Sequence, residues 1–265
     1  KNVGQWWGAE LQLNKTLWDR HIVTLGGEFR DDFEQVQRIS GQIPIHLSRQ
    51  SHAVYVQGDF AVLSNLHLNS GLRYDQYSDF DPSFNPRLGL IYTPVKGSTL
   101  KALYGTAFRA PNFSELSDPR FPDIQPEEIT GYELVYEQEI GKHLRSSLSG
   151  FYNQMDRLIA FDSGSYTNFD AETAGMEVAL EGFWPSGIRG RTSYSFQSTR
   201  NHSVGWRLPD SPSHLAKLNL SAPLMHEKLF AGVEFQFVSN RRSLHNTVDA
   251  TNQPITVQGE DAGSY

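Results

Sequence analysis

The chain has 265 residues, no cysteine and a formal net charge of −7. An acidic chain is a poor partner for nucleic acid, and the lack of cysteine excludes disulfides and thiolate metal sites. No run of eighteen apolar residues occurs, so the sequence contains no candidate for a membrane-spanning helix.

Apolar and polar residues alternate over long segments of the chain. Near the start, the apolar residues Trp7, Ala9, Leu11 and Leu13 alternate with the polar or small residues Gly8, Glu10, Gln12 and Asn14. The pattern recurs over 54–62, 66–75, 176–181 and 229–237. Because successive side chains of a strand point to opposite faces, each segment predicts a strand with one apolar and one polar face.

In chain order, alternation and turn residues predict about twelve strands. They cover 5–14, 21–33, 51–63, 66–78, 85–94, 98–110, 128–140, 144–157, 173–184, 188–200, 213–223 and 228–240. Most are longer than the five or six residues usual in globular sheets. Their length matches the roughly nine to eleven residues that a tilted strand needs to cross a hydrocarbon layer.

The predicted connections are alternately short and long. The short ones, rich in Gly, Pro, Asn and Ser, lie at 63–66, 94–98, 140–144, 184–188 and 223–228, and the long ones at 34–50, 79–84, 111–127, 158–172, 201–212 and 241–255. Short turns on one side and long loops on the other are typical of an outer-membrane β-barrel. A soluble β-sandwich or propeller is the alternative, although sandwiches use shorter strands with less strict parity.

The two ends of the chain also bear on its organisation. The sequence opens inside a predicted strand and stops where another begins. A complete barrel pairs its last strand with its first and leaves no open edge in lipid. We therefore expect residues 1–265 to be an internal part of a longer barrel, with other strands outside this chain.

Several blocks of sequence occur in a fixed order. They are YGTAFRAPNFSEL at 104–116, IQPE at 124–127, YEL at 132–134, GFYN at 150–153, RLI at 157–159, TAGMEV at 173–178 and LPDSPSHLAKLN at 208–219. As an ordered set, covering roughly 50–240, these blocks closely resemble the barrel signature of TonB-dependent outer-membrane receptors.

The resemblance implies a multi-pass barrel of about 22 strands in the bacterial outer membrane, filled by a separate N-terminal plug domain. Such receptors bind a scarce, bulky nutrient and import it with energy delivered by the inner-membrane TonB complex. A ferric siderophore is the expected ligand, ahead of cobalamin. Haem is less expected: haem-binding members of the family tend to place a His after the Phe-Arg-Ala-Pro segment and to follow it with an Asn-Pro-rich box, whereas residues 112–131 contain neither. The alternative function is a passive porin or channel.

Polar side chains on the predicted inner faces carry both signs of charge, which suits contact with a plug. They are Glu10, Glu28, Arg30, Asp59, Arg73, Asp75, Lys101, Arg109, Glu133, Glu137, Glu177, Arg189, Arg191 and Glu234. The main candidates for lumen or plug contact are Arg73, Asp75, Arg109, Glu133 and Glu177. For Arg109 a structural pairing with a nearby inward Glu is favoured over contact with a plug or substrate. In lipid, a basic group would cost about 2–4 kcal/mol at the midplane.

Ligand contacts are expected from the long loops, where aromatic residues occur beside cations. The candidates are Phe113, Arg120, Phe121, Tyr166, Trp206 and Arg207. Aromatic faces and cations suit flat or catecholate ligands and anionic siderophore complexes, through stacking, cation–π contacts and charge-assisted hydrogen bonds.

An enzymatic function is not expected. The sequence has no Gly-x-Ser-x-Gly elbow, and Gly141-Lys142 lacks the first glycine of a phosphate-binding loop. The nine His residues are scattered, without a pair at i and i+2 of a strand, so no metal site and no cofactor are predicted.

Overall fold

The computed structural model describes residues 2–37, 45–116, 123–162, 165–201, 208, 211–225, 228–248 and 254–263. The strands are β1 (Val3–Leu17), β2 (His21–Gln37), β3 (Ile45–Leu63), β4 (Leu66–Tyr77), β5 (Ser83–Val95), β6 (Ser98–Arg109), β7 (Glu127–Ile140), β8 (Leu144–Asp162), β9 (Ser165–Phe183), β10 (Arg189–Asn201), β11 (His214–Pro223), β12 (Phe230–Val238), β13 (Arg241–Val248) and β14 (Pro254–Ala262). A single-turn helix, α1 (Phe113–Leu116), follows β6. No helix in the described residues is long and apolar enough to cross a membrane.

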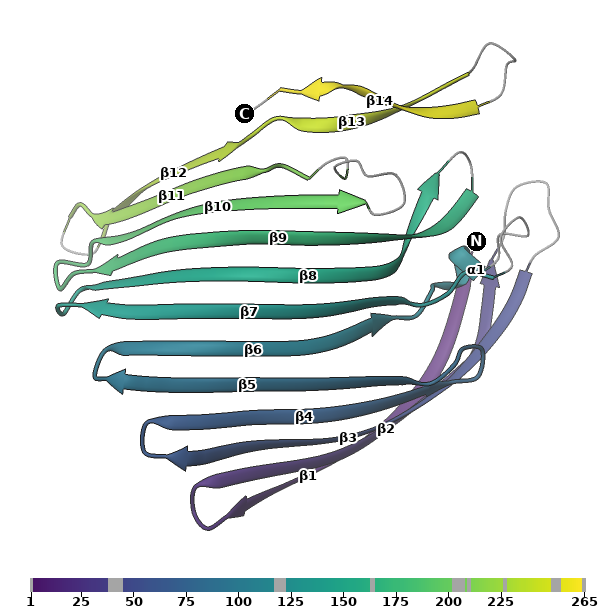
Figure 1. The fold of residues 1–265 in the computed structure, drawn as a ribbon, viewed down its shortest axis with the longest axis horizontal. Coiled ribbons are helices and arrows are strands. Elements are labelled where there is room, and N and C mark those ends of the chain that lie inside the picture. The colour runs from purple at the N-terminus through teal and green to yellow at the C-terminus, as the bar shows by residue number, and fades with distance from the viewer. Residues whose placement is uncertain are drawn as a thin grey trace. The chain divides into compact units, whose positions relative to one another are not determined.

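Strands β1 to β12 are hydrogen-bonded in chain order as one sheet, and β13 pairs with β14 in a second sheet (Figure 1). Each neighbour in the large sheet is therefore also the neighbour in sequence. All twelve strands predicted from the alternation are confirmed. The class is all-β, and the pairing registers of β1 to β4 and of β9 to β12 are antiparallel.

The chain divides into two units that we describe separately. The first comprises residues 1–90, 103–130 and 155–170, and the second comprises 91–102, 131–154 and 171–265. In the first, β1 to β4 pair in long antiparallel registers, which run from Leu17 opposite His21 at one turn and from Leu63 opposite Leu66 at another. In the second, β9 to β12 pair in the same manner.

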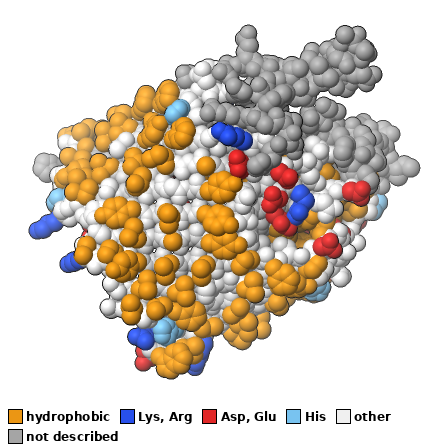
Figure 2. Space-filling view, viewed as in Figure 1, with side chains coloured by type: hydrophobic (Ala, Val, Ile, Leu, Met, Phe, Trp, Pro, Cys, Tyr) orange, Lys and Arg blue, Asp and Glu red, His pale blue; other side chains and the backbone are white. Residues whose placement is uncertain are grey.

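The registers separate apolar and polar side chains by face. On one face of β1 to β4 lie Leu13 opposite Leu25 and Leu25 opposite Val56. These side chains are open to the surroundings, with Leu13 59% and Leu25 55% exposed. Figure 2 shows hydrophobic side chains spread over the face of the sheet turned to the viewer. Large exposed apolar surfaces are unstable in water, and this arrangement is that of strands that face lipid.

Charged residues, in contrast, are among the most buried. Asp75 is 4% exposed and Asp32 6%, while few apolar residues of the described part of the chain are buried, and about half of these are alanines such as Ala53 and Ala179. A soluble domain shows the opposite distribution, because isolated charges are costly to bury. The polar face of the sheet is therefore where the organised contacts of this chain lie.

Two predicted long loops are wrong in extent. The predicted loop 158–172 is largely strand, since β8 continues to Asp162 and β9 begins at Ser165; likewise β2 continues to Gln37 and β3 begins at Ile45 within the predicted loop 34–50. Beyond the lipid both faces of a strand are wet, so alternation ends while backbone pairing continues.

The predicted loop 241–255 is also wrong, because β13 and the start of β14 lie in it. Their backbones pair from Arg241 opposite Ala262 to Val248 opposite Pro254. Residues 241–248 contain only two apolar residues, Leu244 and Val248. Period-two alternation is therefore almost absent there, and no sequence pattern indicated the hairpin.

Candidate functional site

The polar face of the first unit carries a cluster centred on Arg73, which we call the inner-face cluster: Glu28, Tyr55, Arg73 and Asp75. Arg73 donates from Nη1 and Nη2 to the two oxygens of Glu28, at 2.8 and 2.7 Å. Its Nε donates to both oxygens of Asp75 at 3.0 Å. One cation thus lies between two carboxylates, and the bidentate geometry fixes its orientation.

Strand register explains how the cluster forms. Tyr55 lies opposite Arg73 on one side and opposite Gly26 on the other. Because Gly26 has no Cβ, the Tyr55 ring can lie over it; a Cβ at that position would overlap the ring. The Arg73 guanidinium lies 5.7 Å from the ring centroid, and the Tyr55 hydroxyl donates to Gln12 Oε1 at 3.0 Å.

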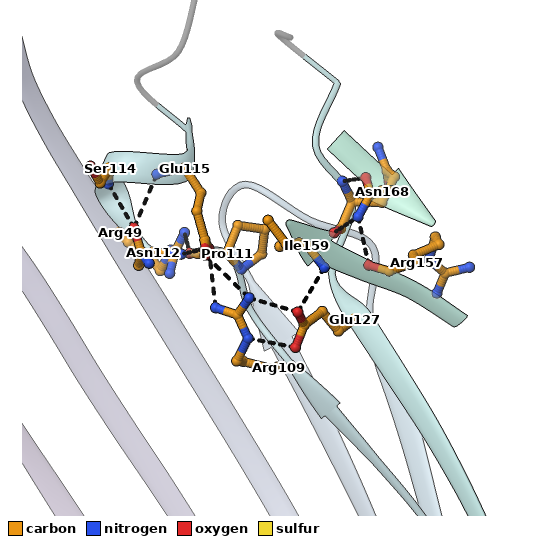
Figure 3. A network of polar contacts seen from close by, with 11 residues as sticks. Arg49, Arg109, Pro111, Asn112, Ser114, Glu115, Glu127, Arg157, Ile159 and Asn168 are labelled. Carbon is orange, nitrogen blue, oxygen red and sulfur yellow. Dashed lines mark hydrogen bonds and ion pairs between the residues drawn. The ribbon is translucent and has the colours of Figure 1, made fainter. Parts of the chain in front are cut away.

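A second cluster lies at the long-loop end of β6, which we call the rim cluster: Arg109, Asn112, Glu115 and Glu127 (Figure 3). Arg109 donates from Nε and Nη2 to Glu127 at 2.6 and 2.8 Å, and from Nη1 and Nη2 to Glu115 at 3.1 and 3.2 Å. Glu127 also accepts from the backbone N–H of Ile159 at 2.8 Å. The cluster therefore joins β6, α1, β7 and β8.

Local sequence explains the position of Glu115. Asn112 is the N-cap of α1: its Oδ1 accepts from the N–H groups of Ser114 and Glu115, at 2.9 and 3.0 Å. In return Glu115 accepts from the Asn112 N–H at 2.7 Å. This reciprocal pattern is a capping box. It holds the Glu115 carboxylate where Arg109 reaches it.

Arg49 of β3 fastens the same segment from the other side. Its Nη2 donates to the carbonyl oxygen of Pro111 at 2.9 Å, and its Nε donates to Asp79 Oδ2 at 2.9 Å. The guanidinium lies 4.8 Å from the Phe80 ring centroid and 4.9 Å from that of Phe113. The Arg49 side chain is only 9% exposed, so this cation has a structural role.

A third fastening joins the end of the 111–127 connection to β8 and β9. Asn168 of β9 accepts from the Gln125 N–H at 2.9 Å and donates to the Arg157 carbonyl at 2.6 Å. Arg157 has a φ of 57°, a conformation uncommon for a residue with a side chain. Its Nε donates to the Pro126 carbonyl at 3.0 Å. The side chains of Asn168 and Arg157 thus bind backbone groups of neighbouring segments and hold these segments together.

The residues predicted for lumen contact are distributed over the polar face. Arg73 and Asp75 form the inner-face cluster, and Arg109 forms the rim cluster. Glu177 of β9 accepts from the Ser195 hydroxyl of β10 at 2.9 Å. Glu133 is half-buried and alternates with the exposed residues of β7. The ion pairs of Arg109 confirm the structural alternative considered for it, while contact with a plug stays a prediction for all five residues.

The residues predicted for ligand binding have different outcomes. Phe113 lies in α1, where Arg49 covers one face of its ring. Tyr166 was predicted in a loop, which is wrong: it lies in β9, with its ring 5.1 Å from that of Phe161. The extended backbone pairing of β8 and β9 explains the difference. Arg120, Phe121, Trp206 and Arg207 lie outside the described residues.

Sequence reasoning missed Arg49, Asn112 and Glu115. The spacing Asn112-x-x-Glu115 is a recognisable helix-start signal and would have indicated α1. No local pattern indicates Arg49, because its partners Asp79 and Pro111 are far away in sequence.

The second unit contains an open cavity of about 1050 Å³ near the short turns. Its charged lining comes from five strands and a turn and includes Glu139, Lys142, His143, Arg145, Glu181, Arg191 and Glu234. Three of these charges are paired in the unit, since Arg191 Nη1 lies 3.0 Å from Glu181 Oε1 and Arg145 Nη2 lies 2.8 Å from Glu137 Oε2. Among the described residues, no group of three or more His, Asp and Glu side chains is placed to hold a metal ion. The arrangement offers charges for binding a polar surface.

Comparison with known proteins agrees with this architecture. The vitamin B12 transporter BtuB of Vibrio vulnificus is 30% identical over 174 residues, which is 63% of this chain and 28% of that protein. The iron-regulated outer membrane virulence protein of Vibrio cholerae is 26% identical over 254 residues, covering 80% of this chain and 39% of that protein. The chain thus spans well under half the length of these relatives.

Solved structures show the same fold. A mutant of the ferric enterobactin receptor PfeA from Pseudomonas aeruginosa superposes with a TM-score of 0.82 at 17% identity, covering 100% of this chain and 45% of that one. The copper transporter OprC superposes with a TM-score of 0.76 at 17% identity, covering 100% and 46%. The family model for the TonB dependent receptor-like β-barrel matches residues 1–265. The chain therefore belongs to the TonB-dependent receptor β-barrel family of the outer membrane.

Proposed function

We propose that the receptor to which this chain belongs actively imports a ferric siderophore across the outer membrane, with energy supplied by the TonB complex. The observation that carries the proposal is the family match over the whole chain. The polar face supports it, because its charges are organised in pairs, as suits a wall that contacts a plug domain. The comparisons give no support to a passive porin.

We also propose that the complete receptor has a plug domain and a region that contacts TonB. Arg73, Asp75, Glu133 and Glu177 offer charges of both signs on the polar face of the strands. A plug domain of the same protein would meet these groups in the lumen. Their mixed signs suit the mixed charge of a protein surface better than the uniform field that would select an ion.

Cobalamin is the second candidate ligand, because the B12 transporter of Vibrio vulnificus has the higher identity, 30% against 26%. The match to the iron-regulated protein covers more of the chain, 80% against 63%. A ferric siderophore complex is commonly anionic, whereas the cations Arg49 and Arg109 are both neutralised by carboxylates here. Recognition of an anion is therefore assigned to Arg120 and Arg207, together with Phe121 and Trp206.

Growth of cells with the intact or deleted gene tests the function. Under iron limitation each ferric siderophore is supplied singly, and a cobalamin auxotroph is tested in parallel. Loss of growth on one siderophore, reproduced by disabling TonB, is the expected result. Loss confined to cobalamin would replace the siderophore by cobalamin, and uptake that persists without TonB would favour a porin.

Equilibrium binding to the intact receptor tests the assigned residues. Arg120→Ala and Arg207→Ala are expected to weaken binding of the siderophore found by growth, because each removes a charge-assisted contact worth about 1.5–3 kcal/mol. Lys96→Ala is the matched control, since Lys96 is an exposed cation in the short turn between β5 and β6 and does not belong to the long loops. Unchanged affinity in both loop variants would move recognition to other residues.

A further inference from the structure

The tight turn between β1 and β2 has an unusual combination of residues. Trp18 and Asp19 form its tip, with φ of 49° and 57°, and the Arg20 N–H donates to the Leu17 carbonyl at 3.3 Å. Turns of this type normally use Gly or Asn, because positive φ is costly for other residues. Trp18 is nevertheless 81% exposed. The strained turn therefore holds a large indole that is mostly exposed and whose ring contacts that of His21.

His21 follows the turn and fixes the orientation of Arg20. The Nε2 of His21 accepts from Arg20 Nε at 3.2 Å, so the ring proton is on Nδ1. That atom is buried, with no hydrogen-bond partner in the described part of the chain. The ring lies between Trp18, at 5.7 Å edge-on, and Phe60, at 5.8 Å. His21 is thus held by aromatic packing and holds the guanidinium in turn.

The contacts of Arg20 leave its outer nitrogens available. Within the described residues Arg20 is exposed and has no ion pair, so Nη1 and Nη2 form an open fork. Lys15 is exposed on β1, two positions before Leu17, which lies opposite His21. Two cations and one acid, Asp19, leave a net charge of +1 around the turn. A guanidinium fork of this kind matches the geometry of a phosphate.

The place of the turn in the fold identifies the source of the phosphate. His21 and Phe60 lie opposite each other on the apolar face, which continues into Leu13, 59% exposed, and Val62, 47% exposed. Short turns of outer-membrane barrels lie on the periplasmic side. The end of the apolar face is therefore at the headgroup level of the inner leaflet, where Trp, Lys and Arg are favoured.

We propose that Trp18, Arg20, His21 and Lys15 form a binding site for the headgroup of one anionic phospholipid of the inner leaflet. Arg20 binds the phosphate through Nη1 and Nη2, and His21 acts as the positioning residue for Arg20. Lys15 reaches the headgroup along the strand, and Trp18 packs beside the glycerol. The net charge of +1 around the turn selects a headgroup of net charge −1, such as phosphatidylglycerol.

Native mass spectrometry of the intact receptor in detergent tests this site. Dioleoylphosphatidylglycerol and dioleoylphosphatidylcholine are titrated separately, and the fraction of receptor that retains one lipid is measured. Arg20→Ala is expected to lower retention of phosphatidylglycerol about fivefold, and Arg20→Lys by less, since it keeps the charge and loses the fork. His21→Phe keeps the ring packing and is expected to resemble Arg20→Lys.

Two matched variants separate a specific site from the general effects of surface charge and of misfolding. Lys96→Ala removes an exposed cation from the turn between β5 and β6, which has no aromatic residue at its tip, and is expected to leave retention within about twofold. Trp18→Gly relieves the positive φ, so it should fold at least as well as the wild type while retaining less lipid.

Three outcomes would overturn the proposal. An equal loss for Arg20→Ala and Lys96→Ala would reduce the effect to general electrostatic attraction. Equal retention of the two lipids would remove the charge selection. Displacement of phosphatidylglycerol by inorganic phosphate would show a site for free anions, not for a lipid. The test is independent of the imported ligand, since no transport is measured.

Discussion

The inner-face cluster and the rim cluster use the same chemistry in different surroundings. Arg73 and Arg109 each lie between two carboxylates. The partners of Arg73 come from β2 and from β4 itself, within one sheet; those of Arg109 come from α1 and from the first residue of β7. Arg73 is 33% exposed beside an Asp75 that is 5% exposed, whereas Arg109 is 44% exposed.

This difference indicates two roles for paired charges in one chain. The inner-face cluster cross-links strands whose register already places the groups together. The rim cluster holds a connection between strands in one conformation, together with Arg49 and Asn168. We therefore expect changes in the first to reduce global stability and changes in the second to loosen residues 110–116 locally.

The largest effect is expected for Arg73→Gln. It leaves Glu28 without its cation and Asp75 as an uncompensated buried charge, which should lower the free energy of unfolding by about 2–3 kcal/mol. Equilibrium unfolding in guanidinium chloride of the receptor folded into phospholipid vesicles measures this change. Arg87→Gln is the matched control on the same face, because Arg87 has no ion pair within the described residues. Equal losses for both variants would contradict the special role of Arg73.

Gly26→Ala disturbs the inner-face cluster without altering a charge. Its Cβ would overlap the Tyr55 ring, and displacing that ring should destabilise the protein by about 1–2 kcal/mol. The control is Gly27→Ala, where the nearest atom to a Cβ is the Ala53 carbonyl oxygen at 3.6 Å. If the neighbouring variant proves equally unstable in the same unfolding assay, the contact between Gly26 and Tyr55 is not the cause.

Arg109→Gln is expected to lower global stability by only about 1 kcal/mol, because the pair is partly exposed. The local effect should be larger, since Glu115 and Glu127 then face each other without a cation. Hydrogen exchange of residues 110–116 should become faster while exchange in β2 and β3 stays unchanged.

Asn112→Ala removes the helix cap at a cost of about 1 kcal/mol and should loosen the same residues. Uniform acceleration across the strands would contradict a local role.

The smallest effect is expected for Arg191→Gln. Its pair with Glu181 is about half exposed on both sides, at 56% and 46%. Exposed pairs contribute about 0.2–1 kcal/mol, so the change in unfolding free energy should stay within that range. A loss as large as that of Arg73→Gln would show that burial does not decide the strength of ion pairs on this face.

Sequence reasoning was accurate for the strands and for Arg73 and Asp75, since alternation assigns both residues to the polar face. It also included a structural acidic partner for Arg109. It failed at the ends of the strands: Tyr166 was placed in a loop because the alternation stops before β9 begins. Pairing through backbone hydrogen bonds needs no particular side chain, so the hydrophobic pattern does not show where a strand begins or ends.

The amino-acid sequence by itself determined the number and order of the strands in the large sheet, the two faces of each strand and the family. Those properties follow from local alternation, turn residues and ordered motifs. Only the tertiary structure decided that Arg49 joins Asp79 to Pro111, that Glu115 shares Arg109 with Glu127, and that β13 pairs with β14. The contacts of Arg49 and Arg109 depend on which segments meet in space, and sequence periodicity carries no information about that. The pairing of β13 with β14 is local, but it forms through backbone hydrogen bonds in a segment where the side chains hardly alternate.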